Sequence, residues 1–304
     1  MKRILWIGIL CSTLMILSNQ TFAQRYLKSK RLSDEANISA KILDDSHWMI
    51  GFKVGMNATM VQQDGFHSVL SSVGQNNEEE KAYTTVTNNI SPNLAAQFFY
   101  YPVRFMAISV QPTFANYRYG YETSHKWLPA ESGLETVRTN YKHQHSLNYF
   151  EAPMLLHFSL SKYPFRFFVQ GGMYYSKLLN ANKTITGDKS ITEGGLTTVT
   201  EEKKKFGIDN QYYDSFWGYT AGGGIGFDLY TTRLSLEVNY KQPMMGITAP
   251  DGKYDNLELV SSYYDISDDL SMRNIEVSIS MAVPLDHIGQ VYNRNSYKGK
   301  KKRK

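Results

Sequence analysis

The chain has 304 residues, of which 42% are hydrophobic, 13% aromatic and 20% charged. This composition excludes a disordered polymer and a low-complexity fibre, and the single cysteine excludes a small fold held by disulfide bonds. The formal net charge is +5, but much of the basic excess lies in residues 298–304. The charge is therefore not spread over a folded face, as it would be in a nucleic-acid-binding protein.

The first 23 residues are typical of a secretory signal peptide. A basic start precedes an apolar run over residues 4–17, and Thr21 and Ala23 place small residues where signal peptidase reads. We predict cleavage after Ala23. A membrane-anchoring helix is the weaker alternative, because the run is shorter than the roughly 20 residues that span a bilayer. Lipoprotein acylation at Cys11 is also weaker, because apolar residues continue after it.

Eight runs of alternating apolar and polar residues follow, and they predict strands with one apolar face and one wet face. Several are longer than the usual strands of soluble proteins. No later segment is long and apolar enough to predict a transmembrane helix. The runs cover residues 48–60, 91–101, 104–119, 145–160, 164–179, 215–229, 233–244 and 272–284.

The connections between these runs are alternately long and short. The long ones are residues 61–90, 120–144, 180–215 and 245–271, and the other three are tight turns. All long links therefore lie at one end, as in outer-membrane barrels with short periplasmic turns and long external loops. We predict an all-β fold, an eight-stranded antiparallel transmembrane β-barrel of the outer membrane with four long external loops. A soluble β-sandwich is the alternative.

Alternation also assigns the two faces of the wall. We predict four lipid-facing residues: Val110, Leu156, Leu236 and Ile279. The opposite row carries charges of both signs, which we interpret as a polar network in the barrel interior: Lys53, Glu151, Arg166, Glu237, Lys241, Arg273 and Glu276. An eight-stranded barrel is just wide enough to be filled by its own side chains, so paired carboxylates inside it would lack the access that catalysis requires. A row of glycines in residues 215–229 would leave room for long side chains from other strands.

Other patterns indicate chemistry only weakly. Residues 222–226 are rich in glycine but lack the ending of a phosphate-binding loop, so we expect no cofactor. His143 and His145 have no recognisable third metal ligand, and we interpret them as exposed loop histidines without a metal. Three aspartates between 265 and 269 read as a solvated acidic face or a weak cation site that bridges lipopolysaccharide phosphates. Residues 201–205 read as loop surface, and no enzyme signature appears.

Two neighbouring segments resemble a known family. Residues 148–158 (NYFEAPMLLHF) and 167–175 (FFVQGGMYY) resemble the Y-x-E-x-P-L-L-L-K-Y and Y-x-x-G-G strands of the PorT-like outer-membrane β-barrel family of Bacteroidota. Residues 51–57 (GFKVGMN) resemble the opening strand of that family, and 222–227 (GGGIGF) its glycine-rich sixth strand. The resemblance extends over residues 48–285.

The resemblance implies a barrel in the outer membrane of a Gram-negative bacterium, in a family whose namesake acts in type IX protein secretion and gliding. We divide the chain into a signal peptide (1–23), an N-terminal periplasmic segment (24–47), the barrel (48–285) and a basic periplasmic tail (286–304). An even number of strands puts both termini in the periplasm. The segment before the barrel and the basic tail depart from the pattern of the family. The tail could contact anionic lipid or a periplasmic partner, and a solvated tail is the alternative.

We therefore expect a non-enzymatic barrel that anchors or assists a cell-envelope assembly. Its expected partners are outer-membrane lipid and lipopolysaccharide, together with periplasmic or outer-membrane proteins, and no nucleic acid. A small pore or transport barrel is one alternative. The other is a surface barrel with ligand-binding, adhesin-like or enzymatic loops.

Overall fold

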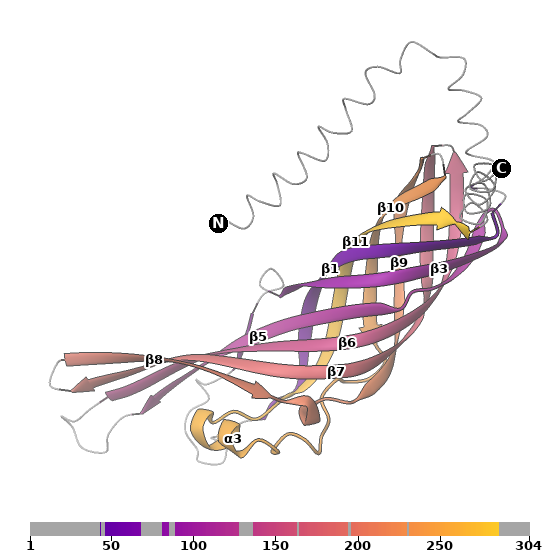
Figure 1. Ribbon diagram of the computed structural model, residues 1–304. Helices are drawn as coiled ribbons and strands as arrows, with labels where there is room; N and C mark the ends of the chain where they lie inside the picture. The colour runs from indigo at the N-terminus through magenta and orange to yellow at the C-terminus, as the bar shows by residue number, and fades with distance from the viewer. Residues whose placement is uncertain are drawn as a thin grey trace, which may run out of the picture.

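The computed structural model describes residues 43, 46–67, 81–84, 89–127, 136–162, 164–193, 196–229 and 231–285. The predicted signal peptide, the basic tail and nearly all of the segment 24–47 lie outside these residues. Within the described part, eleven antiparallel strands form one sheet (Figure 1). They are β1 (Trp48–Gly65), β2 (Ala82–Tyr83), β3 (Ile90–Val103), β4 (Met106–Val110), β5 (Thr113–Trp127), β6 (Thr136–Lys162), β7 (Phe165–Glu193), β8 (Leu196–Gly207), β9 (Ser215–Leu229), β10 (Thr232–Pro243) and β11 (Asp269–Pro284).

The sheet closes into a ring. The first strand, β1, pairs with β3 on one side and with the last strand, β11, on the other, where Met49 lies opposite Pro284. β6 pairs with β7, β7 with β9, β9 with β10, and β10 with β11. With β4 and β5 counted as one wall strand, the ring has eight strands, and the predicted outer-membrane barrel fold is confirmed.

One wall strand is interrupted where the sequence predicted a continuous run over residues 104–119. Gln111 and Pro112 separate β4 from β5 because proline has no N–H to donate to the ladder. The neighbours still hold the gap: the Ala96 N–H donates to the Pro112 carbonyl (3.0 Å) and the Gln111 N–H to the Pro153 carbonyl (3.0 Å). The two pieces therefore act as one strand of the barrel.

Four strands continue well past the ring and form an arm, which we define as the parts of β5–β8 within residues 116–207. Figure 1 shows these strands projecting from the barrel beyond the other strand ends. β5 pairs with β6 up to Trp127 and Val137, and β7 with β8 from Asn182–Gly207 to Glu193–Leu196. The prediction of long loops over residues 120–144 and 180–215 is therefore wrong for most of both segments.

Two short helices lie on the same side of the barrel as the arm. They are η3 (Asp209–Gln211) and α3 (Leu257–Tyr263). The Asn256 side chain caps α3 by accepting a hydrogen bond from the Leu259 N–H (3.2 Å). Among the described residues, no helix has both the length and the hydropathy to cross a bilayer.

The distribution of side chains is inverted relative to that of a water-soluble protein. Large apolar side chains such as Leu94, Met154 and Ile279 point outward and are exposed, whereas Lys53 and Glu276 are buried inside. Aromatic pairs mark both edges of the apolar band: Trp48 with Tyr100 (ring centroids 4.7 Å apart) near the short turns, and Tyr175 with Trp217 (5.2 Å) near the arm. An apolar band flanked by aromatic girdles is the pattern of a barrel surrounded by lipid.

Candidate functional site

The centre of the barrel interior holds a chain of ion pairs. Lys53 Nζ lies 2.7 Å from Glu276 Oε1, and Lys241 Nζ lies 2.6 Å from Glu276 Oε2 and 2.8 Å from Glu151 Oε2. The Tyr117 hydroxyl donates to Glu151 Oε1 (2.6 Å). All of these residues are at most 2% exposed. Each carboxylate is thus held by at least two donors, which offsets the cost of its burial.

A second group surrounds Glu237. Ser280 Oγ donates to Glu237 Oε1 (2.8 Å), and the amides of Gln97 (3.5 Å) and Gln170 (3.4 Å) approach the same carboxylate. Gln170 also donates to Asn239 Oδ1 (2.5 Å). These residues come from β3, β7, β10 and β11, so the network crosses the interior from wall to wall.

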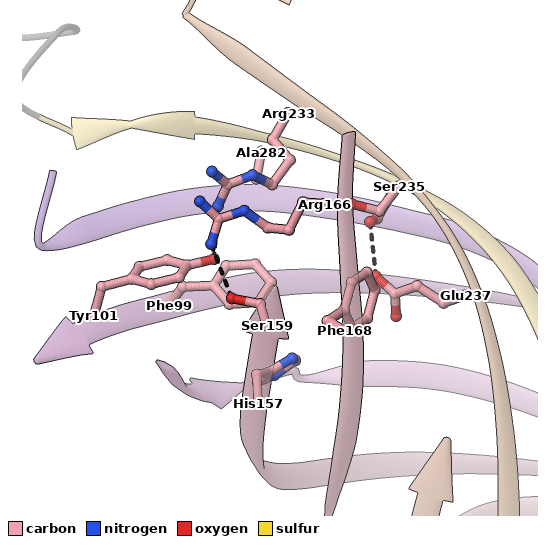
Figure 2. Close-up of a pocket in the computed structure, with 11 residues that line it drawn as sticks. Phe99, Tyr101, His157, Ser159, Arg166, Phe168, Arg233, Ser235, Glu237 and Ala282 are labelled. Carbon is pink, nitrogen blue, oxygen red and sulfur yellow. Dashed lines mark hydrogen bonds between the residues drawn. The ribbon is translucent and has the colours of Figure 1, made fainter. Parts of the chain in front are cut away.

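Two arginines fill the end of the interior that carries the short turns. Arg233 makes a bidentate pair with Asp228 (2.6 and 3.2 Å) and donates to the Tyr101 hydroxyl (2.9 Å). Arg166 donates to Ser159 Oγ (2.9 Å) and also approaches Asp228 (3.9 Å). Figure 2 shows the two guanidinium groups next to each other. The cavity between these side chains is about 30 Å³, which is room for one or two water molecules.

The charges buried in the membrane-spanning part of the described barrel balance each other. The four cations are Lys53, Arg166, Arg233 and Lys241, and the four anions are Glu151, Asp228, Glu237 and Glu276. An unpaired charge would cost several kcal/mol in such a place. Neutrality and the small residual cavity together describe a plug made of wall side chains.

The structure places most of the predicted site residues on the predicted faces. Six of the seven predicted interior charges are buried in this network, and Val110, Leu156, Leu236 and Ile279 are exposed on the outer face. Arg273 is the exception, because its side chain is exposed. It lies two residues before Ile275 on β11 and therefore shares the outward row with that residue. The prediction for Arg273 is wrong.

The glycines of β9 provide the predicted space. A Cβ added at Gly218 would lie 2.3 Å from the ring of Tyr174, and one at Gly224 would lie 2.7 Å from the ring of Phe168. Both aromatic side chains come from β7, the neighbouring strand. The inward glycine row therefore lets large residues of the next strand lie against the wall.

A family model described as outer membrane protein beta-barrel domain matches residues 22–249. The chain belongs to this family. It is an outer-membrane β-barrel protein, as the closed ring and the outward apolar band also indicate. No curated protein matches this outer-membrane barrel.

Several solved structures are similar to the outer-membrane barrel in fold. The attachment invasion locus protein Ail of Yersinia pestis is 11% identical, with a TM-score of 0.29, and the match covers 78% of this chain and 99% of Ail. OprG of Pseudomonas aeruginosa is 9% identical (TM-score 0.36; 78% and 95% covered). The protease OmpT of Escherichia coli is 8% identical (TM-score 0.28; 79% and 97% covered). Likeness at this level carries no information on function.

A second buried polar group, the outer cluster, lies where the arm of the outer-membrane barrel meets the segment after α3. Its residues are Lys81, Tyr121, Lys183, Asp265 and Asp268. Lys183 and the Tyr121 hydroxyl (2.7 Å) both bind Asp265, and Lys81 lies 3.0 Å from Asp268. Burial alone would raise the pKa of Asp265, but Lys183, His143 and Lys81 outweigh it and hold this pKa well below its usual range. The expectation of a solvated acidic face is wrong for these two aspartates.

The two arm histidines are also buried, contrary to the prediction of exposed loop residues. His143 stacks on Tyr121 (centroids 4.6 Å apart) and His145 on Tyr119 (4.4 Å). His145 Nδ1 lies 2.7 Å from the Tyr212 hydroxyl, and burial lowers the pKa of this histidine. Among the described residues, no group of three or more His, Cys, Asp or Glu has metal-binding geometry.

Sequence reasoning missed several members of the interior network, among them Tyr117, Asp228 and Arg233. Asp228 and Arg233 both lie on the inward rows of their strands and face each other across the β9–β10 ladder. Strict alternation applied to the strand ends would therefore have found them. Tyr117 carries no such signal, because an inward tyrosine looks the same whether it packs or donates a hydrogen bond.

Proposed function

We propose that this outer-membrane barrel is a non-enzymatic anchor that holds or assists a cell-envelope assembly of the type IX protein secretion or gliding kind. The observation that carries the proposal is the filled, charge-neutral interior. Because side chains occupy the lumen, the surfaces left for interaction are the outer arm, the lipid-facing wall and the segments at the short-turn end.

The same interior argues against a catalytic site inside the barrel. Glu151 and Glu276 are each held by a lysine and are less than 1% exposed. A carboxylate that acts as an acid or base must reach its substrate, and these two are enclosed. The interior also argues against a pore, which needs a continuous water path, because ion pairs cross the lumen at its centre and the cavity beside the two arginines is only about 30 Å³.

The finer assignment to secretion or gliding in Bacteroidota rests on the resemblance of residues 148–158 and 167–175 to PorT-like strands. These segments form neighbouring parts of β6 and β7, where Glu151 belongs to the central ion-pair chain. We further propose that both termini face the periplasm. This orientation follows from the even number of ring strands and from the short turns at that end.

Cross-linking in cells, purification and mass spectrometry of the tagged full-length chain test the proposal. The key variant replaces residues 123–141, the tip of the β5–β6 hairpin, with an Asn-Gly turn between the paired residues Glu122 and Lys142, which leaves the barrel ring intact. We expect envelope proteins to be recovered with the wild-type chain and to be reduced in either this variant or one that lacks residues 286–304. Which variant loses them identifies the side of the membrane where the partner binds.

Planar-bilayer recordings on the same protein distinguish the alternatives. Reproducible single-channel steps would contradict the filled interior and favour the pore. Recovery of the wild-type chain in the outer membrane without any cross-linked protein partner would contradict the anchor. Fractionation as a soluble protein would contradict the membrane assignment itself.

A further inference from the structure

The outer face of the arm carries a polar hollow directly beyond the lipid-facing band. Its wall includes Arg118, Gln144, Asn182, Thr184, Lys203 and Lys205, and no acidic side chain lines it. Four cations line it, of which Lys204 pairs with Glu258. We call the other three, Arg118, Lys203 and Lys205, the basic shelf. All three are exposed, and none forms an ion pair within the described part of the chain.

Strand pairing fixes which side chains share this face. Gln144 lies opposite Thr184, which lies opposite Lys205, so these three form one row across β6, β7 and β8. Arg118 lies opposite Ser146 in the row nearer the membrane. Side chains on paired positions point to the same face of a sheet. The shelf is therefore a single surface on the side of the arm away from the outer cluster.

The side-chain amides at the base of the shelf hold its arginine in place. Asn116 donates to Asn148 (2.6 Å), and Asn148 donates to Asn180 (2.5 Å), which makes a ladder across three strands. Arg118 Nε donates to Asn116 Oδ1 (3.0 Å). This contact leaves both terminal amino groups of Arg118 without a partner among the described residues, in the planar arrangement that grips a phosphate with two hydrogen bonds.

The end of the shelf nearest the membrane, at Arg118, lies at the outer boundary of the polar layer of the bilayer. Phe114 is exposed and is the last outward apolar residue of β5 before Asn116, and Arg118 follows four residues after it. At about 3.4 Å per residue and a tilt of about 40°, the Arg118 Cα lies about 10 Å beyond the apolar edge. A headgroup layer is roughly 5–8 Å thick on each side of a bilayer. The Arg118 Cα therefore lies just beyond this layer, and its side chain, which extends back toward Asn116, brings the guanidinium to the phosphates of a lipid headgroup.

The acids on the same face lie farther from the membrane than Arg118 and Lys205, and the nearest of them, Glu122, shares the row of Lys203. Glu122, the first of them on β5, already pairs with Lys142 (3.2 Å), and Asp188 and Glu201 lie opposite each other one row beyond. A ligand that approaches from the lipid side thus meets cations and amides first. This order favours an anion attached to lipid.

We infer that the basic shelf binds the phosphate groups of a phosphorylated glycolipid of the outer leaflet, the lipid A part of lipopolysaccharide. The inference rests on the proposed orientation of the barrel, with the arm outside the cell. Arg118 grips one phosphate with its two terminal amino groups, while Lys205 and Lys203 neutralise charge farther out. The amides of Gln144 and Asn182 supply hydrogen bonds to sugar oxygens between them.

Native mass spectrometry of the purified full-length chain in detergent tests this inference. The probes are lipid A with two phosphates, the same lipid with its phosphates removed, and inorganic phosphate. The test variant is Arg118→Gln with Lys205→Gln. The matched control, Arg104→Gln with Lys162→Gln, removes the same charge from exposed residues at the short-turn end.

We expect the test variant to bind phosphorylated lipid A at least tenfold more weakly than the wild type, because a charge-assisted contact to phosphate is worth about tenfold or more in affinity. The control should bind within about twofold of the wild type, and removal of the phosphates should abolish the difference. An unchanged urea midpoint shows that the test variant is folded.

Three results would overturn the inference. They are equal binding of lipid A by the test variant and the wild type, equal binding of the dephosphorylated lipid, and saturation by inorganic phosphate at the same concentration. The last result would assign the shelf to free phosphate. Partner recovery in the cross-linking experiment is independent of this outcome, so failure of the shelf and failure of the anchor are distinguishable.

Discussion

Replacement of Lys241 by methionine tests the charge balance of the barrel interior. The lysine holds Glu151 (2.8 Å) and Glu276 (2.6 Å) at once and is 2% exposed. Lys53 still holds Glu276 after the change, but Glu151 keeps only the hydroxyl of Tyr117. The buried network then carries one uncompensated negative charge.

The loss follows from these contacts. Two charge-assisted hydrogen bonds at about 1.5–3 kcal/mol each give about 3–6 kcal/mol, in agreement with the roughly 3–5 kcal/mol for removing one partner of a buried pair. Addition of Glu151→Gln restores neutrality and should recover at least half of this loss. The lysine and the glutamate are therefore expected to couple by about 2 kcal/mol or more.

Urea unfolding of the barrel in lipid vesicles measures these differences, with the fluorescence of Trp48 and Trp217 as the signal for leaving the membrane. Both tryptophans are exposed on the lipid-facing side. A Lys241→Met variant that loses less than about 1 kcal/mol would refute the balanced interior. So would a double variant that is less stable than the single one.

Two further predictions concern the outer wall and the arm. Leu236→Arg should lower the free energy of unfolding by about 2–4 kcal/mol if the residue meets the bilayer midplane. Ser109→Arg, on the inner row, should instead disrupt the packing of the interior. Equal urea midpoints for the two variants would contradict the assignment of faces. The lowered pKa of Asp265 adds stability that is complete above the unfolded value of about 4 and is lost as pH falls below it. Hydrogen exchange should therefore show weaker protection around Tyr121 and Lys183 at pH 3 than at pH 6, after correction for intrinsic rates. Asp265→Asn should remove this difference, and an unchanged pH dependence in that variant would count against the ion pair.

The ring strands could be predicted because lipid imposes a simple rule on their side chains. Every second residue of β10, such as Leu234, Leu236 and Val238, must be apolar because it faces hydrocarbon. The residues between them face the interior, and Glu237 can be charged there because Ser280 and Gln170 donate hydrogen bonds to it. Period-two alternation captures this rule directly. The short turns are equally visible, because they are the places where the alternation pauses.

The arm could not be predicted in this way because it lies beyond the apolar band, where hydrocarbon imposes no alternation on the side chains. On β6 its buried row holds His143 and His145, and its outer row holds Lys142 and Gln144, so both rows read as polar. The histidines are buried because they stack on Tyr119 and Tyr121 of β5. These contacts depend on the register between β5 and β6. The charged run of β8 gives no better signal. Pairing across four strands decides the structure there, and single-strand composition does not reveal it.

The cross-barrel contacts have a consequence for how the protein enters its membrane. Lys241 reaches Glu151 and Lys53 reaches Gln111 between strands that are not neighbours in the sheet. A half-curled sheet would expose these groups unsatisfied to the hydrocarbon, and the seam between β1 and β11 joins residues more than 200 positions apart along the chain. Partial insertion is therefore penalised at every stage before closure. Folding and membrane insertion should therefore be concerted: β1 pairs with β11 at the same time as the interior ion pairs enter the bilayer.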